Sequence, residues 1–126
     1  MHELSICNAL LVQVEGIARE HRASRVSRIV VRVGPLAGVE ADLLRRAWPL
    51  AAAGTVAADA GLVIEQTDIV VRCSECAAES IVRPNRLLCA NCGGYQTRIV
   101  SGDELILMRV VLEDLATHSA PAAASI

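Results

Sequence analysis

Two Cys-x-x-Cys pairs constrain the fold of this chain more than any other feature of its sequence. The pairs are Cys73–Cys76 and Cys89–Cys92, and twelve residues separate them. A Cys-x-x-Cys turn lets two sulfurs of one short loop reach the same ion, and zinc readily takes tetrahedral thiolate coordination. Two such turns close a four-thiolate site with no open position. The sequence therefore predicts a small ribbon module folded around structural zinc.

Other uses of the four thiols fit the sequence less well. Disulfides require an oxidising compartment, and the first residues, MHELSICNALL, lack the basic segment that opens a secretory signal peptide. A redox pair needs only one Cys-x-x-Cys, in a βαβ context that this sequence lacks. Iron stays an alternative, because the ligands alone do not distinguish it from zinc. We expect a cytoplasmic protein in which Cys7 is a buried small hydrophobe rather than a further ligand.

Charge and composition argue against several classes of function. The net charge is −2, although all twelve basic residues are arginines, and a protein that neutralises phosphates is normally clearly basic. We therefore expect no nucleic-acid partner. No segment has the roughly eighteen uninterrupted apolar residues that cross a membrane, and no phosphate loop, nucleophile motif or zinc-protease motif indicates an enzyme. The rival hypothesis is a zinc-ribbon adaptor that binds nucleic acid or a protein complex, supported only by arginines near the cysteines: Arg72, Arg83, Arg86 and Arg98.

Apolar periodicity predicts two helices and three strands. The helices are expected over residues 4–21 and 40–53, and the strands over 25–33, 62–72 and 104–113, the last of which also suits a helix. Pro49 lies inside the second helix and should kink it or end it early. The last two strands flank the cysteines, and we expect them to pair and hold the insert at the edge of the sheet.

The expected fold class is α+β, with a small sheet packed against two helices and an inserted four-cysteine zinc ribbon. Residues 1–70 and 101–115 would form the α/β domain, and residues 71–100 would form the ribbon. After residue 115 the sequence has no apolar periodicity, so residues 116–126 are expected to be a disordered tail.

The amino terminus is a candidate for a second metal site. Methionine aminopeptidase should leave Met1 in place because His2 is bulky. The α-amine, the amide nitrogen of His2 and its imidazole would then chelate one ion in fused rings, and Glu3 would add its amide nitrogen or its carboxylate. Such nitrogen sets are typical of Ni(II) or Cu(II). By itself the pattern is weak, since a histidine at position 2 is usually a solvated terminal residue.

Taken together, these features resemble the HypA/HybF family of hydrogenase nickel-incorporation proteins. The resemblance rests on Met1-His2-Glu3-Leu4-Ser5 at the start, on the strand and turn Val30-Val31-Arg32-Val33-Gly34, and on Val39-Glu40 opening a helix. The two Cys-x-x-Cys pairs then follow a strand. The match covers about residues 1–115 in order and spacing. It raises the nickel interpretation of the terminus well above the other interpretations.

The resemblance implies a nickel metallochaperone for maturation of [NiFe]-hydrogenase, and in some bacteria also of urease. It implies nickel ligands from Met1, His2 and Glu3, with Glu40 as an auxiliary ligand. The alternative role of Glu40, a carboxylate that favours a helix N-terminus, stays open. The resemblance further implies that Cys73, Cys76, Cys89 and Cys92 hold zinc. The implied partners are a HypB-type GTPase and the hydrogenase large subunit or its maturation complex, with the chain a monomer or weak homodimer.

Overall fold

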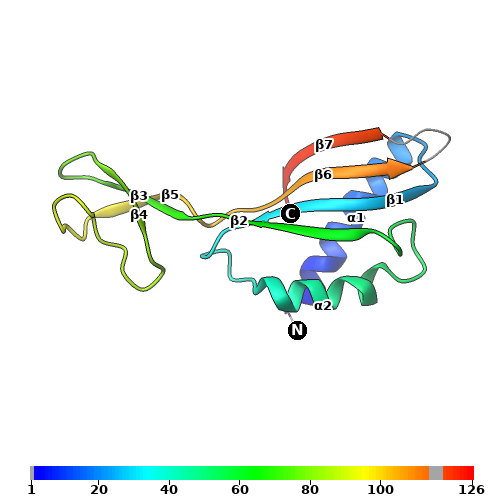
Figure 1. Ribbon diagram of the computed structural model, residues 1–126, viewed down its shortest axis with the longest axis horizontal. Helices are drawn as coiled ribbons and strands as arrows, with labels where there is room; N and C mark the ends of the chain where they lie inside the picture. Colours follow the sequence, from blue (N-terminus) through cyan, green and yellow to red (C-terminus); the bar gives the residue numbers. More distant parts are fainter. Residues whose placement is uncertain (1, 114–117) are drawn as a thin grey trace.

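The computed structural model describes residues 2–113 and 118–126 and contains two helices and two sheets. One sheet has the strand order β2-β1-β6-β7 and the other β4-β3-β5 (Figure 1). In chain order the elements are α1 (His2–Glu20), β1 (Arg25–Val33), α2 (Ala41–Ala52), β2 (Gly61–Gln66), β3 (Ile69–Cys73), β4 (Glu79–Val82), β5 (Thr97–Ser101), β6 (Leu105–Glu113) and β7 (His118–Ser125). The expected α+β class, with two helices on a small sheet and an inserted cysteine module, is confirmed.

The larger sheet is organised around β1, which begins and ends where the sequence predicts. Alternate residues of β1 are buried, among them Val26, Ile29 and Val31, as expected of a strand with one face on the core. β1 pairs in parallel with β2 and antiparallel with β6. The apolar stripe of α1 packs into the same core as α2 and β6 (Figure 1). This core fixes the positions of both helix starts.

The segment 62–72, predicted as one strand, is two strands in two different sheets. β2 ends at Gln66, and β3 begins at Ile69 after the chain has left the first sheet. The predicted pairing between the strands on either side of the cysteines is also wrong, because β2 and β6 both pair with β1. Instead β3 pairs with β5, and this pair carries the small sheet to the far end of the molecule (Figure 1).

Pro49 neither ends the second helix nor stops it short. α2 runs from Ala41 to Ala52 with Pro49 inside it. Leu44, Trp48 and Ala52 on one face of α2 are buried, and the Trp48 indole Nε1–H donates to the Ala60 carbonyl at 3.2 Å. Tertiary packing therefore holds the last turn in helical form in spite of the missing proline N–H.

The C-terminal residues differ from the predicted tail. Residues 118–125 form β7, which pairs antiparallel with β6, so a strand takes the place of the disordered segment expected there. Residues 116 and 117 of that prediction lie outside the described residues. Within the described part of the chain, no helix combines the length and the apolar character that crossing a membrane requires.

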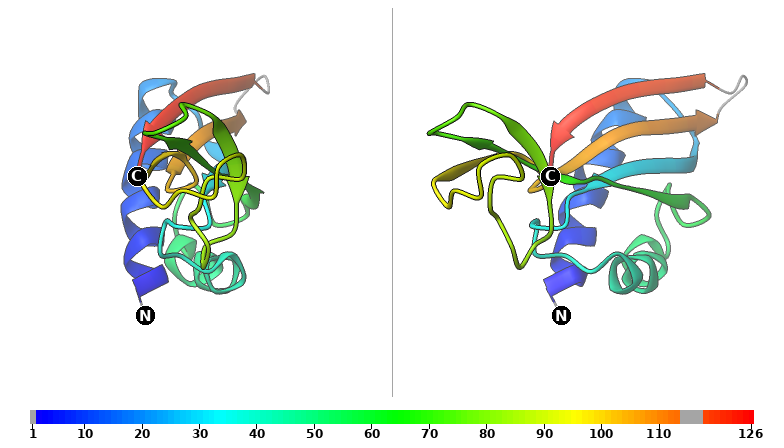
Figure 2. Two further views of the ribbon diagram at one scale, coloured as in Figure 1. Left: turned by 90° about the vertical axis from the view of Figure 1, so that its left-hand side faces the viewer. Right: turned by 60° about the vertical axis from the view of Figure 1, so that its left-hand side comes forward.

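The two sheets meet where the chain crosses itself at Gly34 and Gly102. A Cβ atom on Gly34 would overlap the Gly102 carbonyl, and one on Gly102 would lie 2.8 Å from the Ile69 Cα atom. The Leu36 N–H donates to the Gly102 carbonyl at 2.7 Å, which ties the loop before α2 to the entry of the small sheet. Figure 2 shows the small sheet projecting from this crossing. Glycine is required here by the close approach of backbones.

Candidate metal centre

The structure brings the four predicted zinc ligands together. The sulfur atoms of Cys73, Cys76, Cys89 and Cys92 all lie within 4.8 Å of one another. The Cys73 and Cys92 sulfurs are 3.6 Å apart, and those of Cys76 and Cys89 are 3.5 Å apart. A regular tetrahedron with zinc–sulfur bonds of about 2.3 Å has edges of about 3.8 Å. The donor set and spacing therefore fit a four-thiolate zinc site.

Backbone turns place each pair of sulfurs. In the first, the Ala77 N–H donates to the Cys73 carbonyl at 3.0 Å, and Ala77 has a positive φ of 64°. In the second, the Gly93 N–H donates to the Cys89 carbonyl at 2.8 Å, and Gly93 has a φ of 74°. These bonds make the two loops equivalent, and each loop presents its sulfurs on the inner side of the turn.

Amide groups of the same loops also donate to the sulfurs. The backbone N–H of Glu75 lies 3.4 Å from the Cys73 sulfur, and that of Cys92 lies 3.4 Å from the Cys89 sulfur. The Asn91 side-chain amide lies 3.5 Å from the Cys76 sulfur. Such donors stabilise thiolate over thiol and form the outer shell that commonly orients metal ligands.

The charge balance of the cluster favours a cation at its centre. The backbone N–H of Cys92 lowers the pKa of Cys89 to about 6, although desolvation opposes it. The Gly94 N–H also lowers the pKa of Cys92, but the Cys73 and Cys89 sulfurs and burial together raise it to about 12. Thiols this close cannot all ionise unless a positive charge lies between them. The same distances mean that none of the four forms a disulfide, and Cys7 is a free, buried thiol.

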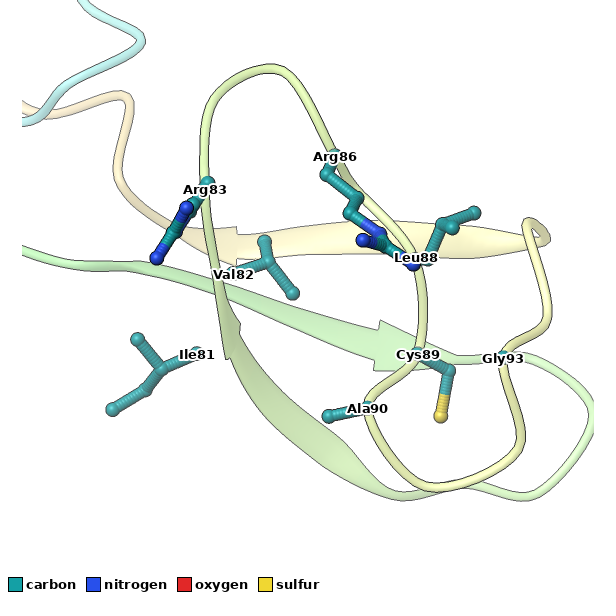
Figure 3. A pocket seen from close by; sticks show the side chains of 8 residues that line it. All are labelled: Ile81, Val82, Arg83, Arg86, Leu88, Cys89, Ala90 and Gly93. Carbon is teal, nitrogen blue, oxygen red and sulfur yellow. The ribbon is translucent and has the colours of Figure 1, made fainter.

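The arginines that supported the rival nucleic-acid hypothesis divide between different environments. Arg72 forms an ion pair with Glu79 at 2.7 Å. Arg83 and Arg86 line a hollow of about 390 Å³ together with Ile81 and apolar neighbours (Figure 3). A nucleic-acid surface is typically a basic stripe, and these three side chains do not form one.

The first turn of α1 forms a second cluster, away from the cysteines. His2 is exposed, and its Nε2 atom lies 2.9 Å from the Gly38 carbonyl oxygen in the loop before α2. Glu3 points inward and is only 8 % exposed. Its carboxylate accepts hydrogen bonds from its own backbone N–H and from that of Glu40, and these bonds lower its pKa while burial opposes them. Two neighbouring side chains thus attach the start of α1 to one loop.

The other predicted nickel ligands occupy different positions relative to this cluster. Glu40 is the N-cap residue of α2 and is exposed, and its side chain makes no capping hydrogen bond. Its backbone lies next to Glu3 through the hydrogen bond just described. Met1 lies outside the described residues. The structure therefore brings His2, Glu3 and Glu40 to the same end of the helical layer.

Sequence reasoning missed two groups at these sites. The Gly38 carbonyl contacts His2, but a backbone acceptor 36 residues away has no signature in the sequence. The Asn91 amide lies inside the second Cys-x-x-Cys, where its identity was visible but its direction toward Cys76 was not. The inward direction of Glu3 was also not predictable, because it depends on the partner loop.

Comparison with known proteins gives the family. The family described as "Hydrogenase/urease nickel incorporation, metallochaperone, hypA" matches residues 1–112. The hydrogenase maturation factor HypA of Nitrosospira multiformis is 48% identical over 112 residues, which are 89% of this chain and 97% of that protein. The solution structure of the Ni metallochaperone HypA from Helicobacter pylori covers 86% of this chain and 94% of its own, with a TM-score of 0.62 and 23% identity. A second solution structure, of a HypA protein, covers 90% and 97%, with a TM-score of 0.69 and 23% identity. With its fold, its four-cysteine cluster and this match, the chain belongs to the HypA family of nickel-incorporation metallochaperones.

Proposed function

We propose that this protein binds Ni(II) through its first residues and delivers it for maturation of [NiFe]-hydrogenase, and where present of urease. The observation that carries the proposal is His2, exposed at the start of α1 in a chain of the HypA family. The ligands would be the Met1 amine, the amide nitrogen and imidazole of His2, and the Glu3 amide nitrogen. Nitrogen sets of this kind suit nickel in square-planar geometry.

The position of these residues at a helix N-terminus supports amide ligation. The first N–H groups of an α-helix have no partner within the helix. His2 and Glu3 are the first two residues of α1, so loss of their amide protons to a metal would break no hydrogen bond of the helical ladder. The buried Glu3 carboxylate is already engaged with the Glu40 backbone. We therefore favour the Glu3 nitrogen over its carboxylate as ligand, and the Glu40 carboxylate as auxiliary ligand.

The two metals would have different tasks. Four thiolates in a closed site hold zinc durably and contribute directly to folding of the module. An exposed terminal site is open to ligand exchange with a docked protein, which suits delivery. The receiving proteins would be a HypB-type GTPase and the hydrogenase large subunit or its maturation complex. The proposal involves no catalytic step.

A His2→Ala variant tests the proposal. We expect it to lose nickel binding and retain zinc and the fold, because His2 contacts only the Gly38 carbonyl among the hydrogen bonds of its side chain described above. Nickel titration followed by calorimetry and metal analysis, with circular dichroism for the fold, measures all three properties. The matched control is His21→Ala, which removes an exposed histidine from the other end of the same helix.

A second variant tests the terminal amine. One residue added before Met1 moves the amine away from the His2 imidazole, so the chelate rings no longer close and nickel affinity should fall as in His2→Ala. Unchanged stoichiometric nickel binding in both variants would overturn the terminal site.

A further inference from the structure

The contact between His2 and Gly38 bears on which ring nitrogen of His2 is available to a metal. The Nε2 atom lies 2.9 Å from the Gly38 carbonyl oxygen. A carbonyl oxygen only accepts hydrogen bonds, so Nε2 must carry the proton. In the neutral imidazole, Nδ1 then has the free lone pair. The contact therefore selects the tautomer in which Nδ1 is the possible metal ligand.

Chelation at the terminus requires the same nitrogen. A ring that starts at the His2 amide nitrogen closes on the metal through Nδ1, which is the ring nitrogen next to the Cγ atom. Nε2 lies on the far side of the imidazole, and its lone pair points away from the backbone. Histidines that bind metals commonly donate their other ring N–H to a carbonyl or carboxylate, which fixes the tautomer and the ring orientation.

We propose that the Gly38 carbonyl is the positioning group of the nickel site, which holds the His2 ring with Nδ1 directed to the metal. This inference rests on the proposed function and adds to it a second group outside the ligand set. The hydrogen bond is retained when nickel binds, because metal and carbonyl use opposite nitrogens. Gly38 itself does not contact the metal.

The loop that carries Gly38 is held at several points, as a positioning group requires. The Ala37 N–H donates to the Gly34 carbonyl at 3.1 Å, and the Leu36 N–H donates to the Gly102 carbonyl at 2.7 Å. Ala37 and Val39 pack against the core. On the far side of Gly38, the Glu40 N–H donates to the Glu3 carboxylate. The acceptor of the His2 proton is thus fixed relative to α1 before any metal binds.

The conformation of Gly38 allows a substitution with a matched control. Gly38 has a φ of +76° and Gly54 a φ of +75°, and a Cβ atom at either position would meet nothing within 4 Å. A β-branched residue is a genuine outlier at such angles, so valine should force either backbone to a new conformation. Gly38→Val moves the carbonyl that contacts His2, whereas Gly54→Val produces the same type of strain at the end of α2, away from the site.

The two variants separate positioning from a general loss of stability. We expect Gly38→Val to bind nickel about tenfold more weakly than the wild type, the scale typical of lost outer-shell contacts. Gly54→Val should bind nickel with wild-type affinity at a similar loss of thermal stability. Equal nickel affinity in Gly38→Val and Gly54→Val would overturn the inference.

Nitrogen-15 NMR of the imidazoles in the wild-type protein tests the same point without a variant. Before nickel is added, we expect Nε2 of His2 to carry the proton and a ring NOE to Gly38 to be present. His21 supplies an internal reference, because its Nδ1 atom is the one that faces a carbonyl, that of Ile17 at 2.9 Å. After nickel is added, Nδ1 of His2 should shift while Nε2 keeps its proton and the NOE persists.

The outcomes distinguish this inference from the proposed function. Nickel on Nε2, or loss of the Gly38 contact on loading, would overturn the positioning role and leave nickel binding by His2 intact. Nickel bound with both His2 nitrogens unchanged would overturn the terminal site itself, and the positioning role with it.

Discussion

At the scale of single residues, the two candidate metal sites use opposite strategies for the same problem of removing protons. Loop amides directed at sulfur stabilise the thiolate of Cys89, whereas Cys7 has no such donors and is fully buried. Burial raises the pKa of Cys7 to about 11, and the Glu3 charge adds to this effect. The thiolate is the reactive form of cysteine. Environment, rather than residue type, therefore separates the metal-binding thiols from the inert one.

Alkylation should reveal this difference. At pH 8 the Cys7 thiol is protonated and buried, so iodoacetamide should leave it unmodified in the folded protein. Removal of zinc by a chelator should add up to four adducts, on the residues of the metal cluster, and denaturant should add the fifth. Peptide mass spectrometry assigns the sites. Labelling of Cys7 in the folded protein as fast as the other cysteines would contradict this prediction.

At the scale of elements, α2 shows packing overriding a local signal. Pro49 removes one helical hydrogen bond, the one to the Arg45 carbonyl, and its ring crowds the preceding turn. The helix continues to Ala52 because Leu44, Trp48 and Ala52 are buried on its inner face. Pro49 itself is exposed. The cost of the proline is therefore borne by an element that the core holds in place.

Replacement of Pro49 by alanine should release that cost. We expect Pro49→Ala to raise the free energy of unfolding by about 1–3 kcal/mol, because the hydrogen bond to Arg45 is restored and alanine favours helix. Urea denaturation followed by circular dichroism measures the change. Leu50→Ala is the control, since Leu50 is 75% exposed and its replacement should change stability by less than about 0.5 kcal/mol. A Pro49→Ala variant no more stable than the control would contradict the argument.

At the scale of the whole molecule, the two sheets depend on different sources of stability. The larger sheet and both helices share one core that includes Leu10, Ile29 and Leu107. In the small sheet the buried residues among those described are few, and two of them are the zinc ligands Cys73 and Cys89. Burial of apolar surface therefore holds the first part together, while the second relies on its metal.

Zinc removal should accordingly unfold one part and spare the other. In a Cys76→Ser, Cys92→Ser double variant, or after chelation, we expect amide protons of β3, β4 and β5 to lose protection from hydrogen exchange. Those of α1, β1 and β6 should remain protected. Hydrogen exchange measured by NMR gives both results, and the wild type loaded with zinc is the reference. Retained protection in β4 without zinc would show that apolar packing alone supports the small sheet.

The sequence by itself determined the elements whose signals are local. The burial alternation of β1, the apolar stripe of α1 and the spacing of the two Cys-x-x-Cys pairs all lie within a few turns or residues. The four sulfurs could therefore be predicted as one site, and they lie within 4.8 Å in the structure. The family resemblance also rested on residues in order along the chain, and the match to residues 1–112 confirms it.

Only the tertiary structure decided features that depend on segments far apart in the chain. The break between β2 and β3 follows from two sheets that compete for one stretch of extended chain, and it is fixed where Gly34 and Gly102 cross. The survival of α2 beyond Pro49 depends on a core built from other elements. The contact of His2 with the Gly38 carbonyl joins positions 36 residues apart. Local sequence encodes which conformations are favourable, whereas the packing of distant segments decides which groups finally meet.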